Sequence, residues 1–537
     1  MNGILKWGFV LFFLTGGQLL AQSVPTWTRA VSFGGSGSDS GTGVKVDAHG
    51  NRYVTGGFSS SVKFGDRVLN SAGGSDIFLA KFDRAGELRW LLQAGGTGDD
   101  VGNDIALDLA GNIYVTGSFT DSAIFPSIHG PSKTVTGVGQ DIFLAKYTPS
   151  GTLVWLQTGT ASATDVNNEG FGVAVEPVTG TVFVTGRSQA PATFSSSDGT
   201  THTIPGLFLW HMFLVKYDSD GNFQWGQTND ASPNTVPHKI AVDENNSAYV
   251  TGWLEGSTTF HSNDGRDLTV TGLSEFVQTP PDFPDDAFIA KYDAQGNVKW
   301  VNLLGGYKGI GTDIAVSHDG QISATGFIGN LGGGTPSQVE TIATSQPGGK
   351  NINLGGGQLT NPYNKDVFVT TYDSAGVLLN ARRIGGVHDD GGSGIAYDRE
   401  DNLYVAGAFQ GTIDVEGHTL TGEKPFNLFV LKFQGPSREE HGKPSAAGGG
   451  LAWAKKADGP GQAGFENNPL IAVKPRGTVL VTGEFVDVAV FDAITLRSAG
   501  AEDIFLAQLN ARHNNHHHDN HDNDDCDGPD CRGPGDN

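Results

Sequence analysis

The chain has 537 residues, of which 79 are glycine, and only 17% of its residues are charged. This composition disfavours long amphipathic helices and favours many short strands joined by turns. The formal net charge of −24 argues against a nucleic-acid partner, because phosphate binding needs clustered Lys and Arg side chains.

The N-terminus has the features of an export signal. Lys6 supplies a positive charge, Trp7 to Leu14 form a short apolar run, and Ala21 offers a small residue before a cleavage point. The apolar run is too short for a transmembrane helix, and no other segment of the sequence approaches 18 apolar residues. We therefore expect residues 1–21 to be a signal peptide, and the mature chain to be secreted, periplasmic or on the cell surface.

A four-residue phrase, Tyr-Val-Thr-Gly in its clearest form, recurs through the body of the chain at intervals of roughly 60 to 80 residues. Its copies begin at Tyr53, Tyr114, Phe183, Tyr249, Ser323, Tyr404 and Leu480. A short apolar strand precedes each copy, and a strand such as Asp76 to Lys81 follows it. A fourth strand comes next and usually carries a tryptophan. The tryptophans of this strand are Trp90, Trp155, Trp225, Trp300 and Trp453, and Asn380 takes the place in one copy.

The repeat array begins and ends at different strands of the repeat. The first tryptophan strand, Pro25 to Ala30, has no preceding strands, and the last copy stops at Asp503 to Asn510 without its tryptophan strand. One end can therefore complete the other, which removes two exposed strand edges. The sequence predicts an all-β fold over residues 22–510. We expect a seven-bladed β-propeller of four-stranded blades, closed by the N-terminal strand completing the last blade.

The recurring phrases resemble the bacterial SBBP-type β-propeller repeat, over about Thr26 to Asn510. The resemblance implies a propeller that is exported or surface-associated. It implies no particular chemistry.

In a propeller of this kind, the loops between the second and third strands emerge on one face, together with the crossings between blades. The longest variable segments, 187–210, 253–285 and 327–365, all belong to that face. Because variable loops on a rigid scaffold commonly bind ligands, we expect a binding site there.

Aromatic and basic side chains single out part of this face. The position after Thr-Gly varies between copies, and the residues predicted to bind a ligand are Arg187, Trp210, His211, Trp253, Tyr307 and Phe327. Such a patch could stack a sugar ring and hold a carboxylate. The alternative is that these aromatic side chains pack against their own loops.

Acidic segments at the crossings between blades, such as 95–100 and 385–390, suggest Ca²⁺ sites at first sight. Because they recur in most copies, the simpler interpretation is that their aspartates cap backbone N–H groups.

Residues 511–537 form a tail rich in His and Asp, which we expect to be disordered. The imidazoles of His516, His517, His518 and His521 suit Zn²⁺, Ni²⁺ or Cu²⁺. Asp525 and Asp527 belong to a stretch that fits the opening of a Ca²⁺ loop, although Pro534 stands where the loop needs Glu. A simple solvated tail is the alternative.

The sequence therefore favours an exported, monomeric, non-enzymatic binding or scaffold protein that needs no cofactor. Its partner would be a glycan or a cell-surface protein. A propeller enzyme acting on polysaccharide, as a hydrolase or lyase, is an alternative, but the spacing of Asp83, Gly86 and Trp90 does not match a sialidase Asp box. A divalent-metal-binding protein that acts through its tail is another.

Overall fold

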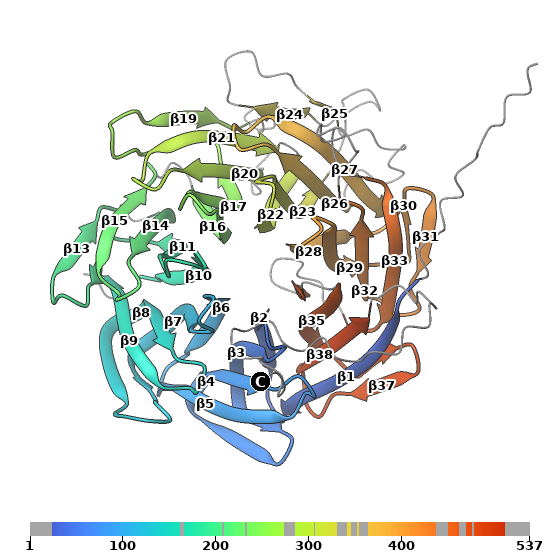
Figure 1. Cartoon of the computed structure of the whole chain (residues 1–537), viewed down its shortest axis with the longest axis horizontal. Coiled ribbons are helices and arrows are strands. Elements are labelled where there is room, and N and C mark those ends of the chain that lie inside the picture. The colour runs from blue at the N-terminus through green and yellow to red at the C-terminus, as the bar shows by residue number, and fades with distance from the viewer. Residues whose placement is uncertain are drawn as a thin grey trace, which may run out of the picture.

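The computed structural model describes residues 24–161, 166–206, 209–230, 234–272, 285–304, 307–329, 341–344, 352–353, 364–435, 449–460, 469–474 and 477–510. These residues form strands and turns and contain no helix, so none of them forms a helix that could span a membrane. The strands are arranged as a propeller-like ring around a central axis (Figure 1).

The same antiparallel pairing of four strands, here called A, B, C and D from the axis outwards, recurs around the ring, as the sequence predicts. The first three such units are β2 (Asp39–Val46), β3 (Arg52–Phe64), β4 (Arg67–Phe82) and β5 (Leu88–Gly96); β6 (Val101–Leu107), β7 (Ile113–Phe125), β8 (Lys133–Tyr147) and β9 (Leu153–Ala161); and β10 (Glu169–Val175), β11 (Val182–Ser188), β14 (His211–Tyr217) and β15 (Phe223–Thr228).

The later units repeat this order. They are β16 (Thr235–Val242), β17 (Ala248–Glu255), β20 (Asp285–Tyr292) and β21 (Val298–Leu304); β22 (Tyr307–Val316), β23 (Ile322–Gly329), β26 (Lys365–Tyr372) and β27 (Leu378–Gly386); β28 (Asp390–Tyr397), β29 (Leu403–Phe409), β32 (Asn427–Phe433) and β33 (Leu451–Asp458); and β34 (Leu470–Val473), β35 (Thr478–Phe485), β38 (Asp503–Asn510) and β1 (Thr26–Gly35).

The prediction of four strands per blade is incomplete, because the segments between strands B and C fold into hairpins. These hairpins are β12 (Ala192–Ser195) with β13 (Thr201–Ile204), β18 (Ser257–Phe260) with β19 (Leu268–Thr271), β24 (Thr341–Thr344) with β25 (Ile352–Asn353), β30 (Thr412–Val415) with β31 (His418–Thr421), and β36 (Val488–Phe491) with β37 (Ile494–Arg497). In the first two units, the hairpins are the outer parts of β3 with β4 and of β7 with β8.

Each hairpin lies against strand D of the preceding unit. Thus β12 pairs with β9, β24 with β21, β30 with β27, and β36 with β33, while a single bridge joins Asn229 to Phe260. These hairpins therefore cover strand edges, and they use parts of the variable segments 187–210, 253–285 and 327–365. Their predicted role as free binding loops applies at most to the remainder.

Pairing by these hairpins also links strands of neighbouring units into shared sheets. The hydrogen-bonded sheets have 14, 4, 6, 2, 6 and 6 strands, so they do not correspond one to one to seven blades.

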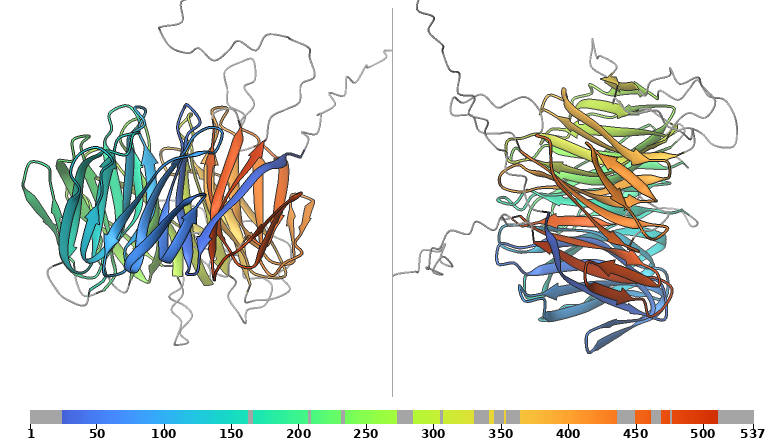
Figure 2. Two further views of the ribbon diagram at one scale, coloured as in Figure 1. Left: turned by 90° about the horizontal axis from the view of Figure 1, so that it is seen from below. Right: turned by 90° about the vertical axis from the view of Figure 1, so that its right-hand side faces the viewer.

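The predicted pairing between the two ends of the array is present. Strand β1 pairs along its length with β38, from Thr26 opposite Asn510 to Phe33 opposite Ile504. The other edge of β38 pairs with β35. Figure 2 shows β1 lying beside the last strands at the side of the disc.

The tight A–B turns explain the recurring Asp, Asn and Tyr. Asp47 accepts hydrogen bonds from the backbone N and side-chain Nδ2 of Asn51, at 2.8 and 2.7 Å, and from the hydroxyl of Tyr53 at 3.2 Å. Gly50 supplies the positive φ of +85° that the turn requires.

The tryptophans of strand D join neighbouring units. Trp90 Nε1 and Lys81 Nζ both donate to the carbonyl oxygen of Pro149 in the next unit, at 3.1 and 2.9 Å. The same arrangement recurs at Trp155 with Lys146, Trp225 with Lys216, and Trp300 with Lys291. These tryptophans are therefore structural.

The aspartates at the crossings cap backbone N–H groups, as predicted. Asp100 Oδ2 accepts from Gly96 N at 2.7 Å, and its Oδ1 accepts from Thr120 N at 3.0 Å. Asp39 and Asp390 accept in the same way from Gly35 and Gly386.

Candidate functional site: the central cavity

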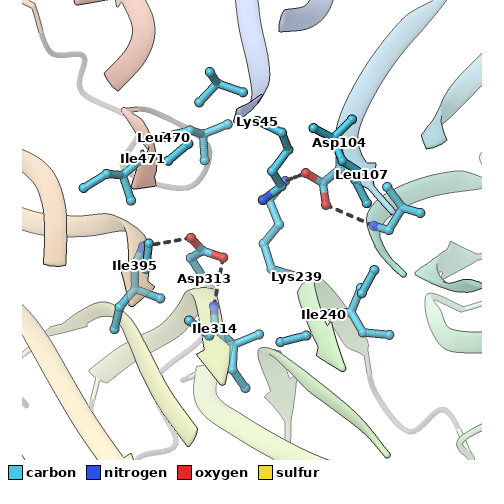
Figure 3. Close-up of a pocket in the computed structure, with 18 of the residues that line it drawn as sticks. Lys45, Asp104, Leu107, Lys239, Ile240, Asp313, Ile314, Ile395, Leu470 and Ile471 are labelled. Carbon is cyan, nitrogen blue, oxygen red and sulfur yellow. Dashed lines mark hydrogen bonds and ion pairs between the residues drawn. The ribbon is translucent and has the colours of Figure 1, made fainter. Parts of the chain in front are cut away.

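The innermost strands line a cavity of about 370 Å³ on the axis of the ring (Figure 3). Every strand A has the same register against its strand B, so equivalent positions can be compared directly. Two positions of each strand A lie on the same face of the strand, because they are two residues apart. We call them inner position 1, opposite the Thr of Thr-Gly, and inner position 3, opposite the first residue of the phrase.

Charged residues interrupt an otherwise small or apolar set at these positions. Inner position 1 holds Gly43, Asp104, Gly172, Lys239, Asp313, Gly394 and Leu470. Inner position 3 holds Lys45, Ala106, Ala174, Ala241, Ala315, Ala396 and Ala472. Since the scaffold is built with Gly or Ala at most of these places, it does not require the charges of Lys45, Asp104, Lys239 and Asp313.

Two of these charges neutralise each other. Lys239 Nζ lies 3.0 Å from Asp104 Oδ1, and both side chains are about nine-tenths buried. Asp104 Oδ2 also accepts a hydrogen bond from Val173 N at 3.0 Å, so the carboxylate is tied to the strand that separates the two units. The pair therefore forms a fixed part of the cavity wall.

Asp313 is held by backbone groups of two adjacent units. Its Oδ1 accepts from Ile314 N at 2.9 Å, and its Oδ2 accepts from Ile395 N at 2.8 Å. Burial raises the pKa of Asp313 to about 6, against the opposing effects of Lys239, Lys45 and the backbone donors. The two lysines and the two backbone donors around it favour the ionised carboxylate.

Lys45 reaches into the cavity from β2 (Figure 3). Within the part of the chain that the structure describes, its Nζ has no carboxylate within 4.0 Å and no hydrogen-bond partner. Its ammonium group faces the same space as Asp313, whose charge it influences. Lys45 is thus a cation in the cavity that is still available to a ligand.

Residues just before inner position 1 join the walls of neighbouring units. Thr312 Oγ1 donates to Gly392 O, and Ser393 Oγ donates to Pro469 O, both at 2.8 Å. Thr42 Oγ1 makes the equivalent bond to Gly102 O. Each residue sits at a β-bulge, where the register against strand B shifts by one. The cavity is therefore lined by strands that are linked laterally.

The residues predicted from sequence to bind a ligand fall into two groups. Arg187 lies over the ring of Trp210 at 4.2 Å, and its Nη2 is 3.1 Å from Glu169 Oε2. Phe327, with 1% of its surface exposed, packs with Ile310 and Ala408 against the half-buried Trp253. The structure thus joins Arg187 to Trp210, and Trp253 to Phe327.

The other residues predicted to bind a ligand or a metal belong to neither group. His211 is buried at the start of β14, and burial lowers its pKa. Tyr307 begins β22, but its side chain lies outside the described residues. The candidate metal ligands His516, His517, His518, His521, Asp525 and Asp527 also lie outside them. Among the described residues, no group of three or more His, Cys, Asp or Glu is arranged to hold a metal ion.

The position of the repeat that follows Thr-Gly does not point to the cavity residues. The position after Thr-Gly varies most, but it includes the buried residues Ser118, Phe327 and Ala408. An alignment of the strands preceding each phrase would have shown Lys45 in a column of alanines. The sequence contained this signal.

Comparisons with known proteins agree with a propeller built from repeats. The family profile described as the SBBP β-propeller repeat matches residues 89–126. An uncharacterized WD repeat-containing protein of Acanthamoeba polyphaga mimivirus is 23% identical over 479 residues, which are 78% of this chain and 32% of that protein. The chain thus spans about a third of the length of the relative it matches. The chain is a β-propeller repeat protein.

Several solved structures are similar at low identity. A streptogramin B lyase is 10% identical, with a TM-score of 0.33, over 90% of this chain and 98% of that one. The quinohemoprotein alcohol dehydrogenase of Comamonas testosteroni is 11% identical, with a TM-score of 0.37, over 91% and 76%. A Synechocystis apocarotenoid oxygenase variant is 12% identical, with a TM-score of 0.33, over 89% and 95%. At these TM-scores the similarity carries no inference about activity.

Proposed function

We propose that this chain is an exported, non-enzymatic binding protein whose ligand site is the central cavity of a seven-bladed propeller. The export-like N-terminal segment supports the location outside the cytoplasm. The excess of acidic residues makes nucleic acid an unsuitable partner.

Support for seven blades comes from the strand pairings. Each A–B–C–D unit carries one copy of the Thr-Gly phrase or its variant in strand B, and the last unit borrows β1 as its strand D. The count of separate sheets differs because hairpin pairing fuses neighbouring units. For example, β7 pairs with β5 of the previous unit.

The observation that carries the function is the set of four charges at positions where other units have mostly Gly or Ala. Burying charged groups costs free energy, so charges that the scaffold does not need are more readily explained by a ligand. The cavity volume falls at the small end of the range for ligand pockets, about 300–1,000 Å³. We therefore expect a small molecule in this cavity.

The test is a thermal-shift screen of the full chain against metabolites, glycans and divalent metals. Ala241 lines the cavity, so Ala241→Phe should block it by filling space without changing charge. Ala48→Phe in the exposed A–B turn is the matched control. A second blocking variant, Ala396→Phe, guards against misfolding of the first, and circular dichroism checks both.

Ligands that stabilise the wild type and Ala48→Phe, but neither blocked variant, would support the proposal. Ligands that still stabilise the blocked variants but fail with Trp253→Ala would place the site on the loop face instead. A metal response lost on deletion of residues 511–537 would assign binding to the tail. Either of these two results, without a cavity ligand, would overturn the proposal.

A further inference from the structure

We propose that the central cavity binds a small zwitterion, namely a free α-amino acid with an apolar side chain. This inference rests on the proposed function, since it names the ligand class of the same site. It is carried by the juxtaposition of Lys45 and Asp313 in a cavity whose uncharged lining residues are, apart from one tyrosine, all aliphatic (Figure 3).

The charge balance of the cavity selects this class. Lys239 and Asp104 are paired at 3.0 Å and compensate each other. Lys45 and Asp313 remain, one cation and one anion, without an ion-pair partner within 4.0 Å among the described residues. An anionic ligand would satisfy only Lys45, and a cationic one only Asp313. A molecule with one carboxylate and one ammonium group satisfies both and leaves the cavity neutral.

Both groups retain hydrogen-bonding capacity. A carboxylate has about four acceptor sites, and Asp313 uses two of them for Ile314 N and Ile395 N. An ammonium group has three donors, and Lys45 uses none of them on described residues. Because Asp313 is held by two backbone groups, it is already oriented when a ligand enters. The site can thus form charge-assisted hydrogen bonds at both ends of an amino acid.

The remaining wall suits an aliphatic side chain better than a sugar. Val46, Leu107, Val242 and Val473 line the cavity and are only partly buried. Tyr397 is the one aromatic residue among the lining residues, and its hydroxyl already lies 2.6 Å from Ser323 Oγ. Sugar rings are usually held against aromatic faces, which this lining does not offer in number.

Isothermal titration of the full chain with L-leucine, L-isoleucine, L-valine and L-phenylalanine tests the proposal. N-acetyl-leucine lacks the ammonium group, and leucinamide lacks the carboxylate. We expect at least one of the amino acids to bind, and the corresponding analogues to bind at least tenfold more weakly. The N-acetyl and amide analogues of each amino acid that binds are compared in the same way.

Substitutions of Lys45 and Asp313 test which charged group of the amino acid each residue binds. Lys45→Ala installs the residue that the other units carry, and it should weaken amino-acid binding at least tenfold while the unfolding temperature stays close to that of the wild type. Lys45→Arg should retain binding, and Asp313→Asn should weaken it. Lys63→Ala, on the exposed outer hairpin, is the matched control and should change nothing.

Binding of N-acetyl-leucine as tight as that of leucine would overturn the proposal in favour of a simple anion. Equal binding of leucinamide would overturn it in favour of a cation. Absence of binding by all four amino acids at millimolar concentration would also overturn it. In each case the cavity remains the ligand site if a different class of molecule stabilises the wild type but not Ala241→Phe, so failure of this inference is distinguishable from failure of the proposed function.

Discussion

Buried carboxyl groups at the crossings between units lie close to a second carboxyl group. Asp39 faces Asp503, and Asp390 faces Asp366, across the junction of adjacent units. Burial is the largest cause of the raised pKa values, which reach about 7 for Asp39 and about 8 for Asp390, and the second carboxylate adds to the effect. These carboxyl groups are therefore partly protonated near neutral pH.

The raised pKa of Asp390 makes stability depend on pH with a definite sign. A group whose folded pKa lies above its ordinary value of 3.8 stabilises the fold fully below that value, and the contribution is lost as pH rises through about 8. Asp390→Asn removes this titration but also removes one acceptor, because Asp390 holds both Gly386 N and Gln410 N. We expect the variant to be clearly less stable than the wild type at pH 5, with the gap shrinking by pH 8.5.

Thermal unfolding of the wild type and of Asp390→Asn between pH 5 and pH 8.5 measures their difference in stability directly. Comparison with the wild type removes the contribution of other titrating groups. A gap that widens as pH rises would contradict the assignment of the raised pKa to Asp390.

Some individual residues of the fold and site could be predicted from the sequence, and others could not. The turn aspartates, the tryptophans and the crossing aspartates could be assigned because each recurs with the same spacing. Lys45 and Asp313 matter for the opposite reason, since they depart from the repeat. Asp104 and Lys239 lie in units that are not adjacent in sequence, so their pairing at 3.0 Å follows only from closure of the ring.

At the level of elements, the hairpins between strands B and C are the feature that sequence comparison missed. Strands A to D have similar sequences in all units, whereas the hairpins share little sequence. Their apolar residues still alternate, as in the Ala-Thr-Phe-Ser of β12, where Ala192 and Phe194 are buried. Short alternating runs are ambiguous when they stand alone, and their partner strand belongs to another unit.

Phe194 provides a test of this structural role. It is 2% exposed and lies 5.2 Å from Phe213, measured between ring centroids, within the core shared by two units. Phe194→Ala should lower the free energy of unfolding by about 3–5 kcal/mol, as expected for a buried phenylalanine. Urea unfolding measures the change.

The exposed Thr201→Ala on the partner strand is the control and should change stability by less than about 0.5 kcal/mol. If Phe194→Ala behaved like this control, the 187–210 segment would be a free loop, as the sequence first suggested.

Closure of the ring depends on β1. Its ten residues join the two ends of the repeat array and place Phe33 against Phe64 and Phe82, at centroid distances of 4.7 and 5.1 Å. Without β1, strand β38 would expose an edge, and open edges promote association between chains.

Deletion of residues 1–35 should therefore lower the unfolding temperature strongly and produce oligomers. Loss of the buried Trp27 and Phe33 side chains alone should cost several kcal/mol, on the order of 3–5 for each. Deletion of residues 1–23 is the matched control, since it leaves β1 intact. Calorimetry and sedimentation measure both effects, and equal unfolding temperatures for the two deletions would contradict the role of β1 in closure.

We expect the ligand in the axial cavity and not on the loop face. The most direct measurement is a crystal structure of the full chain grown with the strongest ligand from the thermal-shift screen. We expect ordered density inside the cavity, with a ligand atom within hydrogen-bond distance of Lys45 Nζ. A ligand bound instead at Arg187 and Trp210, with only water in the cavity, would contradict the claim.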